Sequence, residues 1–168
     1  MTRHHALPLD PAALDELRHA DDAGHTPRPY PSADGDEPLR CCLRPSRAGE
    51  RIALVTYAPL RRWAARTGAA PGAYDEQGPV FVHADACAGP APTAPGTPYP
   101  FARPGALRAF RRYDAAGRIT GGRVVEVPLD ACAAYDAALD EAFTDPDVAL
   151  VHVRAVEYGC FQFEVRRP

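Results

Sequence analysis

The sequence predicts an α+β fold: a mostly antiparallel sheet of about five to six strands, one principal helix in the C-terminal half and a short N-terminal helix. Short runs of β-branched and aromatic residues are bounded by Gly and Pro turns. Two pairs of these runs are joined by short turns, and one segment repeats apolar residues at helical spacing. The 168 residues favour a single domain.

The N-terminal segment begins with a short helix over residues 10–21, for which Asp10 suits the N-cap and the next proline the first helical position. Residues 24–38 are rich in Pro, Gly and Asp, a composition typical of an irregular connector. We therefore divide the chain into an N-terminal helix and connector, residues 1–36, and a single α+β domain, residues 37–168.

The first half of this domain contains two predicted strands, over residues 51–57 and 80–84, and a helical turn over residues 60–67 that carries Trp63. Residues 85–106 follow and contain six prolines, which exclude regular structure. An irregular segment of this length is either a functional cover or a tolerated insertion.

The second half contains four predicted strands and the principal helix. Gly117 supplies the positive φ that the turn between the first two strands needs. The apolar residues of the helix recur on one face, which we expect to contact the sheet. The strands cover residues 107–114, 118–127, 148–156 and 160–166, the helix covers residues 130–143, and its apolar face consists of Cys132, Tyr135, Leu139 and Phe143.

The last hairpin has one apolar and one polar face. A turn over residues 157–159 places His152 opposite Glu164 on the polar face. The same register places Arg154 opposite Gln162. This face is either a solvated sheet surface with cross-strand pairs or the floor of a polar pocket covered by the proline-rich segment.

Four short motifs carry a family resemblance: Arg-Cys-Cys-Leu-Arg at 40–44, Gly-Pro-Val-Phe-Val-His at 78–83, Arg-Tyr-Asp at 112–114 and Gly-Cys-Phe at 159–161. As a set they resemble a bacterial family known only as domain of unknown function 1203, over residues 37–168. The usual first motif begins Pro-Cys-Arg-x-Cys-Leu. Here Leu39 replaces the first Cys, which weakens a two-Cys metal clip at that place. The resemblance implies the domain and no activity.

Composition excludes several classes of protein. The formal net charge is −3 and no basic face is visible, so we expect no nucleic-acid partner. No apolar run approaches the roughly 20 residues of a membrane helix, so we expect no membrane partner. The chain contains no Lys, and neither of its two Ser residues lies in a Gly-x-Ser-x-Gly elbow. Five cysteines without a secretory signal indicate free thiols and a cytoplasmic protein.

The candidate metal ligands are Cys42, His83 and Cys87, within a wider set that also contains His152 and Cys160. Cys and His are the ligand types that zinc prefers, so zinc or iron is the candidate cofactor. The spacings match no zinc finger or ribbon. The alternative is a set of separate thiols and surface histidines. We expect the neighbouring Cys41 to point away from Cys42 if this segment is extended.

The candidate catalytic residues are Cys160, His152 and Arg154. Positive charge near Cys160 would lower the pKa of its thiol, and Cys–His pairs support nucleophilic catalysis. The alternative is an inert, half-buried thiol. Together with the metal candidates, these residues suggest a small cytosolic protein with a Cys/His/Arg-lined polar pocket. On this hypothesis the protein is a metal- or thiol-dependent enzyme that acts on a small molecule.

A non-catalytic domain that binds a small anion or a protein partner is the other hypothesis. Arginine side chains suit carboxylate and phosphate ligands, although such clusters are commonly solvated surfaces. Whether the protein is an enzyme, and its oligomeric state, stay open at this stage. The arginines of the first C-terminal hairpin are Arg108, Arg111, Arg112, Arg118 and Arg123.

Overall fold

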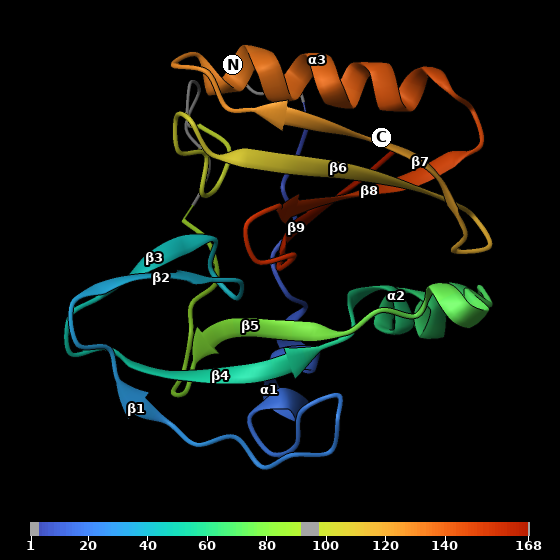
Figure 1. The fold of residues 1–168 in the computed structure, drawn as a ribbon. Helices are drawn as coiled ribbons and strands as arrows, with labels where there is room; N and C mark the ends of the chain where they lie inside the picture. The colour runs from blue at the N-terminus through green and yellow to red at the C-terminus, as the bar shows by residue number, and fades with distance from the viewer. Residues whose placement is uncertain (1–3, 92–97, 168) are drawn as a thin grey trace.

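The α+β fold class is confirmed, but the strands form two sheets rather than one (Figure 1). The structure is a computed structural model that describes residues 4–91 and 98–167. The five-stranded sheet has the order β1-β4-β5-β2-β3, and the four-stranded sheet has the order β7-β6-β8-β9. Within these sheets only the β2–β5 pair is parallel.

The strands of the five-stranded sheet are β1 (Tyr30–Pro31), β2 (Gly35–Leu39), β3 (Arg44–Arg47), β4 (Arg51–Tyr57) and β5 (Gly78–His83). The four-stranded sheet consists of β6 (Leu107–Asp114), β7 (Ile119–Glu126), β8 (Val148–Ala155) and β9 (Phe161–Arg166). The helices are α1 (Pro11–Leu17), α2 (Pro59–Thr67) and α3 (Ala131–Thr144), with a 3-10 turn, η1, over Gly72–Tyr74.

Most predicted elements agree closely with the structure, and the differences lie in the N-terminal third. Strands β4 and β6 have the predicted bounds, and Gly117 has a φ of 84° in the β6–β7 turn. The N-terminal helix ends at Leu17, four residues early. The predicted connector contains β1 and β2, whose Pro-containing sequences lack a strand pattern and are ordered by pairing with β4 and β5.

Residues before position 37 take part in the same packing as the rest of the chain. Leu14 and Leu17 of α1 belong to the hydrophobic cluster that contains Ile52 of β4 and Val82 of β5. The proposed division into residues 1–36 and 37–168 stays a prediction.

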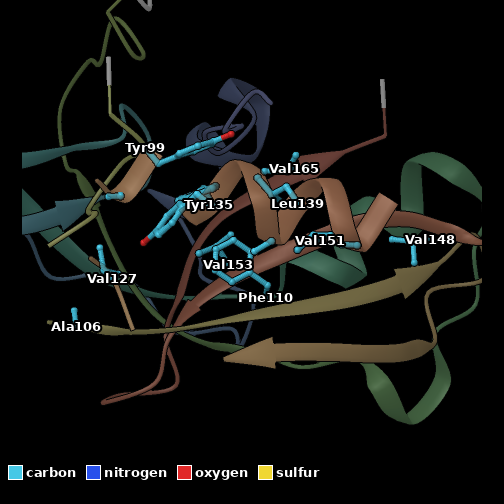
Figure 2. Packing of buried hydrophobic residues seen from close by; sticks show 14 residues of the cluster. Tyr99, Ala106, Phe110, Val127, Tyr135, Leu139, Val148, Val151, Val153 and Val165 are labelled. Carbon is cyan, nitrogen blue, oxygen red and sulfur yellow. The ribbon is translucent and has the colours of Figure 1, made fainter. Parts of the chain in front are cut away.

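Helix α3 covers one face of the four-stranded sheet, as Figure 2 shows. Tyr135 and Leu139 are fully buried and point from the helix toward Phe110 of β6 and Val151 and Val153 of β8. Asp130 caps the helix by accepting a hydrogen bond from the backbone N–H three residues on. Of the predicted helix face, Tyr135 and Leu139 are in the core, Phe143 packs at its margin, and Cys132 is half-buried outside this cluster.

The proline-rich segment contains no helix or strand in the residues that the structure describes, and residues 92–97 lie outside them. Its C-terminal part is anchored to α3. The buried Tyr99 packs against Tyr135, and its hydroxyl donates a 2.6 Å hydrogen bond to Asp136.

The polar face of the β8–β9 hairpin is buried rather than solvated. His152 is only 1% exposed and lies between the rings of Tyr113 and Phe161. It pairs with Glu164 in the predicted register. A β-bulge after Val153 then places Arg154 opposite Phe161 instead of Gln162. The solvated interpretation was wrong because the second sheet and α2 supply apolar partners for this face.

None of the helices in the described parts of the chain is long and apolar enough to cross a bilayer.

Replacing Leu139 by Ala should lower the free energy of unfolding by about 2–5 kcal/mol, because it leaves a cavity between α3 and the sheet. Leu129, 93% exposed just before α3, is the matched control, and Leu129→Ala should change stability by no more than about 0.5 kcal/mol. Chemical denaturation measures both. Equal effects would contradict the packing role of Leu139.

The stability of the protein should fall as the pH falls below about 6.5, in part because burial lowers the pKa of His152 from its ordinary value. In that range the unfolded chain binds a proton that the folded chain excludes, so acid favours unfolding. Unfolding temperatures at pH about 7.5 and about 5.5 measure this effect. His152→Gln keeps an N–H donor near Glu164 but does not titrate, so its unfolding temperature should depend less on pH. An unchanged pH dependence would contradict the assignment.

Candidate metal centre

Three thiols and one imidazole meet at the C-terminal ends of β2 and β5 in the five-stranded sheet: Cys41, Cys42, His83 and Cys87. Their possible ligand atoms all lie within 4.8 Å of one another. Both neighbouring cysteines are buried, while His83 and Cys87 are half-buried. We call this set the Cys/His cluster. It contains all three predicted metal ligands and one residue, Cys41, that the sequence analysis did not assign to it.

The pairing of β2 with β5 assembles the cluster. The two strands are parallel and pair at Leu39 and Phe81, so their C-terminal ends lie together. The backbone N–H of Arg40 donates a 2.9 Å hydrogen bond to the Phe81 carbonyl just beyond this pair. The β2–β3 turn therefore lies beside His83, the last residue of β5, and Cys87 lies four residues beyond it.

A tight turn, rather than extended chain, holds the two neighbouring cysteines. Residues 40–43 form this turn, and the backbone N–H of Leu43 donates a 2.9 Å hydrogen bond to the Leu39 carbonyl. Leu43 has a φ of 57°, a left-handed conformation that reverses the chain. Both sulfur atoms consequently face His83; because the segment is not extended, the alternation that would turn only one of them inward does not apply.

The His83 imidazole is in contact with both of these cysteines. Its Nδ1 atom lies 3.3 Å from Cys41 Sγ and 3.8 Å from Cys42 Sγ. The His83 backbone N–H also donates a 3.3 Å hydrogen bond to Cys41 Sγ. Cys41 Sγ thus contacts both the ring and the backbone of His83, and Cys42 Sγ contacts the ring.

The pKa values of the two neighbouring thiols are shifted in opposite directions. A hydrogen bond from Cys41, a backbone N–H bond from Arg44 and the nearby His83 and Arg44 lower the pKa of the Cys42 thiol to about 6, against the opposing effect of burial. The same hydrogen bond and burial raise the pKa of Cys41. The cluster therefore contains thiolate character near neutral pH, and thiolate is the form of Cys that binds metals.

An ion pair covers the outer side of the imidazole. Arg44 donates two hydrogen bonds to the Glu50 carboxylate, at 2.6 and 3.0 Å. Arg44 Nη2 lies 3.2 Å from His83 Nε2, and Glu50 Oε2 lies 3.7 Å from the same nitrogen. The bonds from Arg44 are the main cause that lowers the pKa of Glu50 to about 2, so its carboxylate is ionised.

The predicted catalytic residues do not join this cluster. His152 Nε2 lies 3.2 Å from Glu164 Oε2 within the core. Arg154 donates to the Gly159 carbonyl and forms an ion pair with Glu76.

Cys160 is half-buried, and its sulfur contacts the Tyr158 carbonyl at 3.6 Å. Within the described residues, no hydrogen bond joins Cys160 to His152 or Arg154. Their catalytic role stays a prediction.

Most arginines of the first C-terminal hairpin are paired with carboxylates. Arg108 pairs with Glu157 at 3.2 Å and Arg118 with Asp114 at 2.9 Å. Arg111 and Arg123 form ion pairs as well, with Glu76 and Glu141 respectively. A small anion would have to compete with these carboxylates, and the predicted anion partner stays a prediction.

The family comparison agrees with the motifs that build the cluster. The family model described as Protein of unknown function (DUF1203) matches residues 36–167. The chain belongs to this family. The comparison with curated proteins found no match, and neither did the comparison with solved structures. The DUF1203 match includes the β2–β3 turn, β5 and the whole four-stranded sheet, so it covers every member of the Cys/His cluster.

In the metal-free protein, the thiolate absorbance in the ultraviolet should decrease as the pH is lowered through about 6, because Cys42 regains its proton there. Cys42→Ser should abolish this step, whereas Cys132→Ser, outside the cluster on α3, should leave it in place. A step of the same size in the Cys42 variant would show that another group is responsible.

Proposed function

We propose that this protein binds one zinc ion through Cys41, Cys42, His83 and Cys87. The single observation that carries the proposal is the convergence of these four ligand atoms within 4.8 Å of one another. Three sulfurs and one imidazole nitrogen are a donor set typical of structural zinc sites. The thiolate character of Cys42 supports the proposal, since metal binding requires deprotonated sulfur.

The distances in the cluster are close to those of a tetrahedral zinc ion. Zinc–sulfur bonds of about 2.3 Å and zinc–nitrogen bonds of about 2.0–2.1 Å imply ligand atoms separated by roughly 3.6–3.8 Å. The contacts from His83 Nδ1 to Cys41 Sγ and Cys42 Sγ, at 3.3 and 3.8 Å, are near this range. Cys87 lies on irregular chain beyond β5, so a small rotation of its side chain can adjust its distance to the other ligand atoms.

A closed set of four protein ligands favours a structural or regulatory role over metal catalysis. Catalytic zinc sites typically keep one position for water or substrate, and here four protein groups supply all four positions. The ion would join the β2–β3 turn to the segment after β5. Iron is less suited to this set, because iron–sulfur clusters take four Cys ligands or two Cys with two His.

The protein purified without a tag or chelator should contain about one equivalent of zinc by elemental analysis. Cys42→Ser and Cys87→Ser should weaken zinc binding by more than the 10- to 100-fold that outer partners of a metal site typically contribute. Competition with a chromophoric chelator measures the affinity. Cys132→Ser and Cys160→Ser are matched controls outside the cluster, and both should bind zinc as the unaltered protein does.

The proposal would be overturned by a protein that binds no zinc, or by Cys42 and Cys87 variants that bind it as tightly as the controls. If elemental analysis found copper instead of zinc, the choice of metal would be wrong, since soft thiolate ligands also suit Cu(I). Circular dichroism of each variant without metal separates loss of a ligand from loss of the fold. Because zinc would bind only the folded state, saturating zinc should also raise the unfolding temperature of the unaltered protein.

A further inference from the structure

We propose that Glu50 is a positioning residue for this site: it accepts the Nε2–H of His83 and so fixes the imidazole tautomer that presents Nδ1 to the metal. The inference rests on the proposed zinc function and assigns a role to a residue outside the four ligands. It is argued from the contacts on the outer side of the imidazole.

The contacts of His83 Nε2 decide which imidazole tautomer this site can hold. Arg44 Nη2 lies 3.2 Å from His83 Nε2, and a guanidinium group can only donate hydrogen bonds. His83 Nε2 must therefore accept, and in a neutral imidazole the proton is then on Nδ1. That proton is directed at Cys41 Sγ, 3.3 Å away. In this state Nδ1 has no lone pair free for a metal.

Zinc binding at Nδ1 requires this proton to leave. A metal held at Nδ1 would need the tautomer with the proton on Nε2, because Nδ1 must then supply its lone pair. Nε2–H then needs an acceptor, and the donor group of Arg44 cannot serve. Ligating histidines generally donate this second N–H to a carboxylate, a carbonyl or a water molecule.

Glu50 is the carboxylate in position to accept. Its Oε2 lies 3.7 Å from His83 Nε2, and no other carboxylate forms an ion pair with this imidazole in the described residues. Two hydrogen bonds from Arg44 and one from the backbone N–H of Arg47, at 2.7 Å, hold the carboxylate beside the ring. A small movement of the Arg44 guanidinium away from Nε2 would allow the Glu50 contact to shorten to a hydrogen bond.

The test compares two variants that break the same ion pair from opposite sides. Glu50→Gln removes the carboxylate charge with little change in shape, and we expect it to weaken zinc binding about 10- to 100-fold. Arg44→Gln also breaks the pair but leaves the Glu50 carboxylate, so it should weaken zinc binding less. Chelator competition measures both affinities, and the unfolding temperatures of the metal-free variants measure the structural cost of losing the pair.

The outcomes separate this inference from the zinc proposal. If the unaltered protein binds no zinc, the zinc proposal itself fails. If it binds zinc but Glu50→Gln binds equally well, Glu50 has no positioning role. A loss in Arg44→Gln as large as that in Glu50→Gln would assign the effect to the ion pair and also overturn the inference. A larger loss in Glu50→Gln, with equal metal-free unfolding temperatures, supports it.

Discussion

The side chain of Arg40 links the two sheets, and the candidate metal centre depends on the same turn. Arg40 follows β2 of the five-stranded sheet, and its Nε donates a 2.8 Å hydrogen bond to the Phe161 carbonyl of β9 in the other sheet. Nη1 donates to the Pro38 carbonyl, and the guanidinium lies over the Phe101 ring. Burial lowers the pKa of this arginine to about 10, and it is only 2% exposed. A buried cation that is satisfied by carbonyls holds its backbone in one place, which fixes the next two residues, Cys41 and Cys42.

The two groups of polar residues in the core have different chemical character. His152 Nε2 and Glu164 form a buried pair at 3.2 Å, and burial lowers the pKa of His152. The Cys/His cluster lies at a sheet edge, where His83 and Cys87 are half-buried and an ion can enter. Its ligand atoms are sulfurs and an imidazole nitrogen, and the Glu50 carboxylate faces the outer side of His83. Thiolate ligands on one side of a histidine and a carboxylate on its other side are typical of a metal site whose histidine is held by a hydrogen-bond partner.

Zinc binding would strengthen a part of the fold in which backbone pairing between strands is sparse. The β2–β3 hairpin contains Gly35 and Pro38 in β2 and Pro45 in β3, and β2 meets β5 at a single backbone pair. An ion held jointly by the turn at residues 40–43, by β5 and by Cys87 would cross-link these segments. The proposed role is therefore structural or regulatory. Cys87, the last of the four ligands along the chain, lies near the start of the proline-rich segment over residues 85–106.

The sequence by itself determined the strands β4 and β6, helix α3 and the residue types of the metal site. These features depend on local periodicity, on turn residues such as Gly117 and on the preference of zinc for Cys and His. Tertiary structure decided the division into two sheets, the bulge that displaces Arg154 and the inclusion of Cys41 in place of Cys160 and His152. The physical reason is that the parallel pair between β2 and β5 joins segments about 40 residues apart, a contact that no local sequence pattern encodes.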